Sequence, residues 1–267
     1  ENEDLIESKL ELGHVMNSES DRPRGRCEDS TTMIVRGVDC RKIELHFSTM
    51  ASDAKKRNRV IDYNVRSHGT SETTVEQAEQ LVYEGLCRLH DEWKSEGHED
   101  NEGGLHFADL TLIDKGWMGS WTDDGEKKTW ASQPVERFCT EKGIRHFLPA
   151  KGQPSYRQPE PSREVIIGDN WHINRGKGRE RICSEVIWNA EHWHSLVEGL
   201  FMTAEDDPHG FELFASEPGL WINHKRLAEH IREGSADLAE LRKRATKTRK
   251  PKYRRDHFWD SFAMMLV

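Results

Sequence analysis

The sequence predicts an α/β fold in which an antiparallel three-stranded meander is followed by parallel strands, with helices flanking the sheet. Three observations predict it: three strand-like segments follow one another closely, a long amphipathic helix comes next, and short buried strands then alternate with helices. Antiparallel neighbours need only short turns, whereas parallel neighbours need crossover connections, which helices usually supply. The order of the segments therefore indicates the fold class.

The first part of the chain contains the meander and the long helix. Strands are expected at residues 32–39, 42–50 and 59–65. In the second strand, Ile43, Leu45 and Phe47 alternate with polar residues, which is the period-two pattern of a strand. A helix is expected at about 74–93, because its apolar residues recur at spacings of three and four.

The second part of the chain alternates between the two kinds of element. We expect a strand at 105–114, a helix at about 133–142, a strand at 145–149, an extended loop or hairpin at 152–181, a helix within 182–200, a strand at 211–214, and helices at 221–231 and 256–267. The order β-β-β-α-β-α-β is that of an RNase H-like mixed sheet. Residues 1–30 are expected to be a linker or N-terminal extension, and 31–267 one domain with an insertion at about 152–252.

Composition excludes several classes of protein. No apolar run approaches the roughly 20 residues of a membrane helix, and the acidic N-terminus does not resemble a signal peptide, so we expect a soluble, non-secreted protein. The five cysteines are scattered without a Cys-x-x-Cys pair, which argues against both a disulfide framework and a structural zinc site. His192 and His194 lack a third zinc ligand at suitable spacing, so zinc is not expected there either.

Positive charge is concentrated in one segment near the end of the sequence, although the net charge of the whole sequence is −9. Nine basic residues and no acid occur between positions 242 and 255: Arg242, Lys243, Arg244, Lys247, Arg249, Lys250, Lys252, Arg254 and Arg255. Such a run is either a solvated face or a surface that binds the DNA backbone. We expect the second, because the run leads directly into the apolar segment at the end of the sequence.

Three carboxylates occupy unusual places. Asp39 and Asp114 each end a buried strand, and Asp260 lies inside the apolar terminal helix. The first and fourth strands are neighbours in an RNase H-like sheet, so these acids are expected to meet. Acids gathered in this way raise one another's pKa unless a positive group lies between them, and Mg²⁺ or Mn²⁺ is the simplest such group. The alternative, that each Asp is a turn, cap or surface residue, stays open.

Several segments resemble motifs of the lambda-type phage large terminase family, in its C-terminal nuclease domain. They are Val35–Asp39, Leu112–Gly116, Val135–Cys139, Leu148–Gly152 and Arg255–Ser261. The resemblance covers about residue 31 to the end, and its four motif regions, of which Val135–Cys139 and Leu148–Gly152 together make up one, occur in the correct order. It is looser at Trp117–Trp121, and no Gly-x-x-x-x-Gly-Lys-Ser/Thr loop is present, so the sequence lacks the ATPase half.

The resemblance implies a metal-dependent endonuclease that cuts concatemeric double-stranded viral DNA in the host cytoplasm. Asp39, Asp114 and Asp260 would be catalytic and would bind two divalent cations, Mg²⁺ or Mn²⁺, with Asp256 as a further candidate ligand. His257 and Lys151 would support them. The implied partners are DNA, a packaging ATPase domain, the small terminase subunit and the portal, and no membrane.

Two other functions remain open from the sequence. One is another RNase H-like nuclease, similar to a resolvase or a transposase, which would prefer junctions or terminal sequences. The other is a non-catalytic module that binds DNA or docks on the portal, which would bind no metal at the three acids.

Overall fold

The computed structural model describes residues 10–116, 134–153, 156–175, 184–203, 210–216, 224–233 and 257–267, apart from the side chains of Val75, Glu76, His257 and Trp259. Among these residues, no helix is both long enough and apolar enough to cross a membrane. Four of the cysteines, Cys27, Cys40, Cys87 and Cys139, are described, and none of them forms a disulfide.

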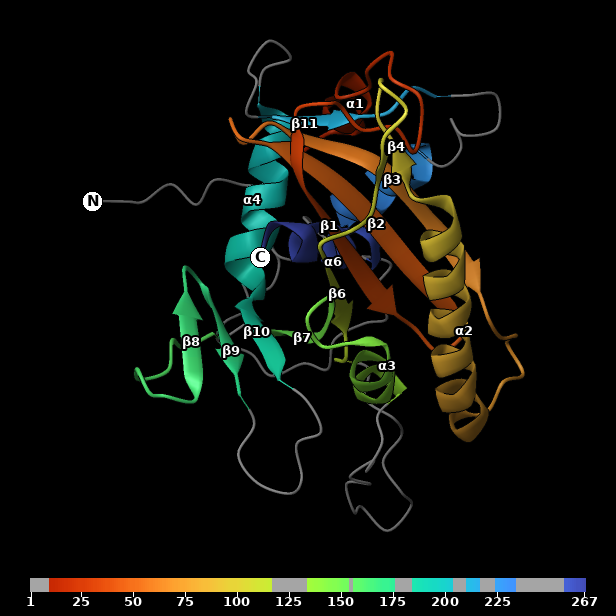
Figure 1. The fold of residues 1–267 in the computed structure, drawn as a ribbon, viewed down its shortest axis with the longest axis vertical. Coiled ribbons are helices and arrows are strands. Elements are labelled where there is room, and N and C mark those ends of the chain that lie inside the picture. Colours follow the sequence, from red (N-terminus) through yellow and green to blue (C-terminus); the bar gives the residue numbers. More distant parts are fainter. Residues whose placement is uncertain are drawn as a thin grey trace.

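A nine-stranded mixed sheet forms the centre of the molecule (Figure 1). Its strand order is β11-β3-β2-β1-β6-β7-β10-β9-β8. The bounds are β1 Thr31–Cys40, β2 Glu44–Asp53, β3 Asn58–Ser67, β6 Leu110–Asp114, β7 Phe147–Gln153, β8 Val165–Gly168, β9 Trp171–Asn174, β10 Glu185–Asn189 and β11 Phe211–Leu213. A separate pair is formed by β4 His98–Glu99 and β5 Leu105–His106.

The predicted RNase H-like sheet is confirmed by the directions of its strands. β1, β2 and β3 form an antiparallel meander, and β6 runs parallel to β1 on the other side. β7 and β10 continue the parallel part. The first and fourth strands of the expected order are therefore neighbours, as the sequence predicted.

Helices cover both faces of the sheet (Figure 1). Their bounds are α1 Leu12–Asn17, α2 Val75–Glu96, α3 Pro134–Lys142, α4 Ala190–Met202 and α6 His257–Leu266, and residues 224–233 are also helical. The helices α2 and α3 pack on one face around Phe138 and Leu86. On the other face, α4 and α6 pack around Phe201 and Phe262.

Strand β1 is buried on both sides, because its side chains alternate between two faces of the sheet and helices cover each face. Val38 and Cys40 point into the core beneath α2 and α3. Gly37 and Asp39 point to the opposite face, because successive side chains of a strand alternate. That face is covered by α6, whose backbone closely approaches Gly37. The alternation thus directs the carboxylate of Asp39 toward α6.

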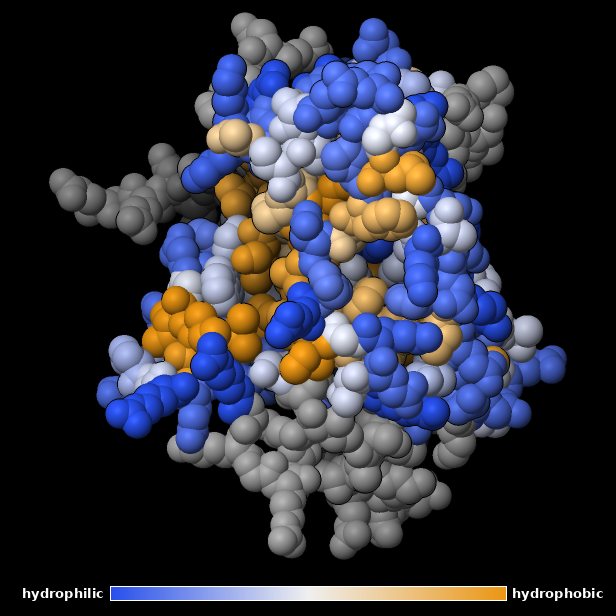
Figure 2. Space-filling model, in the orientation of Figure 1, coloured by the Kyte–Doolittle hydropathy of each residue, from blue (hydrophilic) through white to orange (hydrophobic). Residues whose placement is uncertain are grey.

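The segments outside the predicted core of the fold contribute to the same sheet. Within 152–252, the region expected as an insertion, lie β8, β9, β10 and β11. Within 10–30, Val15 is fully buried, and Ser20 and Leu213 are joined by a backbone hydrogen bond of 2.9 Å. Figure 2 shows that apolar residues gather on the surface over the β8–β9 hairpin, where Ile166 is exposed.

The helix expected within 182–200 is partly wrong. Residues 185–189 form β10, and α4 begins at Ala190. A short apolar run such as Val186–Trp188 fits a buried strand and a helix equally well by periodicity alone. The boundary is marked by Asn189, whose side-chain oxygen caps α4 by accepting a hydrogen bond of 3.2 Å from the backbone N–H of His192.

Candidate metal and active site

Asp39 and Asp114 lie at the carboxyl ends of neighbouring parallel strands. The last paired residues of β1 and β6 are Val38 and Ile113, and each Asp comes one residue later. Asp39 has no exposed surface, and Asp114 is half-buried. The predicted proximity of these two acids thus follows from the register of the sheet.

Asp260 reaches the same place from α6. The Nε atom of Arg41 donates to Asp39 Oδ2 at 2.8 Å, and its Nη2 atom donates to Asp260 Oδ2 at 3.3 Å. One guanidinium therefore joins an acid of β1 to an acid of α6. The second oxygen of Asp260 lies 3.0 Å from His194 Nε2, on α4.

A close approach of two backbones places α6 at this point. A Cβ atom on Gly37 would lie 2.0 Å from the backbone oxygen of Ser261, so only glycine fits there. The hydroxyls of Ser48 and Ser261 are 2.7 Å apart and fully buried, which joins β2 to the same turn of α6. Asp260 is held next to this contact, because it directly precedes Ser261.

The acids interact electrostatically. Burial, then the charge of Asp39 and then that of Asp260 raise the pKa of Asp114 to about 8. The N–H of Gly116 donates to Asp114 Oδ1 at 2.9 Å and partly offsets this rise. The sequence predicted that gathered acids would raise one another's pKa unless a positive group lay between them. The guanidinium of Arg41 lies between Asp39 and Asp260, yet the pKa of Asp114 remains high.

The residue after Asp114 holds the neighbouring elements together. Lys115 Nζ contacts Glu136 of α3 at 2.5 Å and also forms an ion pair with Glu185 of β10. Burial opposes the charge of this amine, but hydrogen bonds to both carboxylates raise the pKa of Lys115. The end of β6 is therefore fastened to α3 and to β10.

The three acids offer the oxygen ligands that Mg²⁺ and Mn²⁺ prefer. Within the described ranges, however, no three His, Cys, Asp or Glu side chains are gathered closely enough to enclose an ion. The donor atoms thus fit a divalent cation in kind. A cation held by all three acids would need their carboxylates to lie closer together than they do in this structure.

The structure describes only some of the other residues that were predicted to belong to the site. Lys151 is exposed on β7, one residue beyond the pair of Asp114 and Ala150. The helix α6 begins at His257, whose side chain is outside the described atoms. Asp256 and the whole basic run from Arg242 to Arg255 also lie outside the described residues.

Two residues of this site were not predicted. Arg41 is separated from Asp260 by 219 positions in the chain, so no local pattern marks their contact. His194 was considered only as a zinc ligand, and the structure places it against Asp260 instead. A weak signal existed for Arg41, because a cation two residues after a buried Asp at a strand end can reach that carboxylate.

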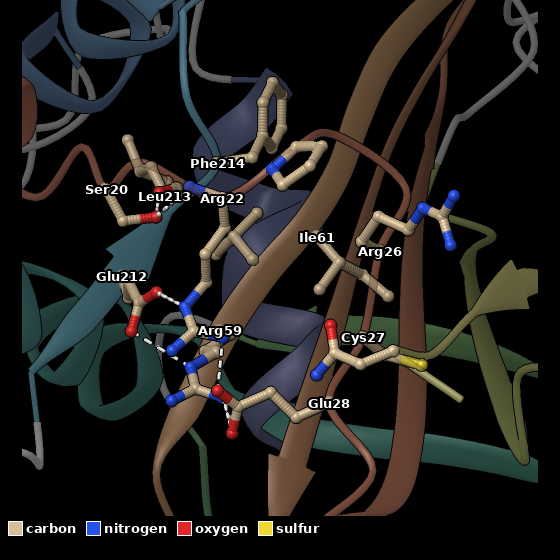
Figure 3. Close-up of a pocket in the computed structure, with 13 residues that line it drawn as sticks. Ser20, Arg22, Arg26, Cys27, Glu28, Arg59, Ile61, Glu212, Leu213 and Phe214 are labelled. Atoms are coloured by element: carbon tan, nitrogen blue, oxygen red, sulfur yellow. Dashed lines mark hydrogen bonds and ion pairs between the residues drawn. The ribbon is translucent and has the colours of Figure 1, made fainter. Parts of the chain in front are cut away.

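A cavity of about 300 Å³ lies elsewhere, between the segment 20–28, β3 and β11 (Figure 3). Arg22 and Arg59 alternate there with Glu28 and Glu212; for example, Arg59 Nε is 2.9 Å from Glu212 Oε2. These ion pairs fasten the N-terminal segment to the edge of the sheet. None of the predicted site residues lines this cavity.

No family model matches the chain, and no curated protein does. One similar solved structure is T. thermophilus RuvC in complex with a Holliday junction substrate, with 9% identity over 88% of this chain and 91% of that chain and a TM-score of 0.31. Another is the Aquifex aeolicus PPX-GPPA enzyme, with 17% identity over 62% and 56% and a TM-score of 0.24. The strand order and strand directions of the sheet define a mixed α/β protein of RNase H-like topology.

Proposed function

We propose that this chain is a divalent-metal-dependent DNA endonuclease. The observation that carries the proposal is the placement of acids from β1, β6 and α6 at one end of the sheet, where Arg41 contacts Asp39 and Asp260 and the pKa of Asp114 is raised to about 8. Burial and the neighbouring carboxylates disfavour the ionised form of Asp114, and a divalent cation at this place would favour it. Perturbed carboxylates of this kind are typical of functional sites.

In this proposal Asp39, Asp114 and Asp260 hold two ions, Mg²⁺ or Mn²⁺. Such ions supply Lewis-acid chemistry for phosphodiester hydrolysis. His194 orients the carboxylate of Asp260 through its contact of 3.0 Å. Lys115 fixes the end of β6, and so the backbone that carries Asp114, through Glu136 and Glu185.

Contacts to DNA are proposed for the basic run from Arg242 to Arg255. Its last residue is two positions before α6, the helix that carries Asp260, so the chain itself links the run to the acids. Lysine and arginine contacts to phosphates are independent of base sequence and weaken as salt rises. Lys151, exposed on β7 near the end of β6, is proposed as a further phosphate contact.

More specifically, we propose the nuclease domain of a phage-type large terminase, which cuts concatemeric double-stranded DNA during packaging. Support comes from the resemblance of the motif regions, which include Asp39, Asp114 and Asp260. A packaging ATPase domain, a small terminase subunit and a portal would be its partners. The sequence contains no phosphate-binding loop for ATP, so the motor would have to be supplied elsewhere.

Nicking of supercoiled plasmid tests the nuclease proposal. The protein is incubated with Mn²⁺, Mg²⁺ or EDTA, beside Asp39→Asn and the control Asp53→Asn, which changes an acid at the opposite end of the β1–β2 ladder. We expect metal-dependent nicking that Asp39→Asn reduces more than about 100-fold, since even residues that merely support metal ligands contribute 10–100-fold. Asp53→Asn should nick normally. Equal nicking by Asp39→Asn and wild type would contradict the assignment.

Substrate preference tests the terminase proposal separately. Linear duplex DNA and a four-way junction of the same length are compared as substrates at one salt concentration. A terminase nuclease should cut the duplex at least as well as the junction. Strong preference for the junction would favour a resolvase-like nuclease and contradict the packaging role.

A further inference from the structure

We propose that Arg41 is the resident cation of the acidic site, which neutralises Asp39 and Asp260 in the metal-free protein and leaves them when a divalent cation binds. Released from the acids, the guanidinium would then bind a phosphate of the DNA. This inference rests on the proposed function of the same site, because it concerns how that site exchanges one cation for another.

The guanidinium of Arg41 supplies a positive charge to two of the three acids that are proposed to bind metal. Its guanidinium contacts Oδ2 of Asp39 at 2.8 Å and Oδ2 of Asp260 at 3.3 Å. A fully buried carboxylate such as Asp39 needs a nearby positive charge, because an uncompensated buried charge is strongly destabilising. A divalent cation held by the carboxylates of Asp39 and Asp260 would compete with the guanidinium for them. The two cations are therefore expected to be alternatives.

The side chain of Arg41 is accessible to solvent. Its side chain is 36% exposed, and it follows the last residue of β1. Its backbone N–H donates to the carbonyl of Glu44 at 2.9 Å, so the backbone stays anchored while the side chain rotates outward. Arg36 provides a contrast on the same strand: it is 4% exposed and stacks 3.9 Å from the ring of Trp93. The two arginines thus differ in their access to solvent, and Arg41 at the acids is the more exposed of the two.

The released side chain would be well placed for the substrate. A phosphodiester that is to be cut must come to the end of β1 and β6, where Asp39 and Asp114 lie. A guanidinium suits this partner because its parallel N–H donors match two oxygens of a phosphate. Metal binding would then create a phosphate-binding group at the site.

Titration of Mn²⁺ by calorimetry tests the exchange without any cleavage. Wild type is compared with Arg41→Gln, with Arg41→Lys, and with the control Arg57→Gln, whose arginine is equally exposed and pairs with Asp53 in the β2–β3 turn. We expect Arg41→Gln to bind Mn²⁺ at least about tenfold more tightly, which is about 1.4 kcal/mol. Arg41→Lys should bind more nearly as wild type does, and Arg57→Gln should be unchanged. Weaker or unaltered Mn²⁺ binding by Arg41→Gln would overturn the proposal, because that result is expected if Arg41 only orders the acids.

A second measurement uses the wild-type protein, in case Arg41→Gln does not fold. The Nε–H resonance of Arg41 is assigned by its loss in Arg41→Lys and is followed during addition of diamagnetic Mg²⁺. We expect it to be protected from solvent exchange without metal and to lose that protection as Mg²⁺ saturates. Protection that persists at saturating Mg²⁺ would refute the exchange.

These readouts separate the two proposals. Tighter Mn²⁺ binding by Arg41→Gln without nicking by any variant would support the exchange and refute the nuclease. Metal-dependent nicking with unchanged Mn²⁺ affinity in Arg41→Gln would support the nuclease and refute the exchange. Absence of metal binding in wild type and Arg41→Gln alike would refute both.

Discussion

Replacing Gly37 with alanine is expected to displace α6 and to destabilise the protein strongly. The new Cβ would lie 2.0 Å from the backbone oxygen of Ser261 and 3.1 Å from the Cβ of Met264. Backbone atoms of a packed helix cannot yield as the end of a flexible side chain can, so the whole helix must shift. We expect a loss of roughly 3 kcal/mol, the upper end of ordinary overpacking. For a protein of this size that lowers Tm by about 6–12 °C, measured by thermal unfolding.

The matched control for this variant is Gly199→Ala in α4. A Cβ on Gly199 meets nothing within 4 Å, and alanine favours a helix over glycine by about 0.5–1 kcal/mol. The control should therefore be neutral or slightly more stable than wild type. Gly37→Ala should also bind Mn²⁺ weakly, because Asp260 moves with α6. A Tm of Gly37→Ala within a degree of wild type would contradict the close packing of β1 and α6.

Replacing Asp114 with asparagine is expected to stabilise the metal-free protein at pH 8 while removing its response to metal. Burial, together with the charges of Asp39 and Asp260, raises the pKa of Asp114 to about 8. The folded protein thus favours the neutral acid, so this group's contribution to stability is present at low pH and is lost as the pH rises from about 4 toward 8. Asparagine is neutral throughout and can keep the hydrogen bond from the N–H of Gly116.

The expected gain in stability of Asp114→Asn follows from the size of the pKa shift of Asp114 and from how far solvent screens that carboxyl. One pKa unit corresponds to about 1.4 kcal/mol, and solvent reaching a half-buried carboxyl reduces the sum, so we expect on the order of 2 kcal/mol at pH 8. Melting curves at pH 4 and pH 8, with and without Mn²⁺, measure it. The Tm values of wild type and Asp114→Asn should coincide at pH 4, and only wild type should gain stability from Mn²⁺.

The control Asp53→Asn should be less stable than wild type at pH 8, because hydrogen bonds from the backbone and side chain of Arg57 lower the pKa of Asp53. Lower stability of metal-free Asp114→Asn than of metal-free wild type at pH 8 would contradict the raised pKa of Asp114.

The parts of the fold that sequence could predict are those fixed by local patterns. The alternation along residues 42–50 and the apolar spacing along 74–93 led to β2 and α2. The order of the elements then led to the adjacency of β1 and β6, and so to the proximity of Asp39 and Asp114. Asp260 was predicted to join them from its place in an apolar helix, and its ion pair with Arg41 links it to Asp39.

The remaining features depend on contacts between distant parts of the chain. The side chain of Lys115 meets Glu185 only because β6, β7 and β10 are successive strands of the sheet. His194 meets Asp260 only because α4 packs against α6. The close approach at Gly37 is of the same kind: a glycine in a strand signals that something comes near, but not which element. Local patterns thus indicated the acids, whereas the groups that neutralise and orient them became known only from the tertiary structure.

Anomalous diffraction from crystals soaked in Mn²⁺ tests the metal site most directly, because it locates the ion without depending on cleavage or on a substrate. We predict an anomalous peak between the carboxylates of Asp39, Asp114 and Asp260, and no such peak in crystals of Asp39→Asn. Occupied Mn²⁺ sites elsewhere on the protein, with none at these three acids, would contradict the proposed metal centre and with it the nuclease.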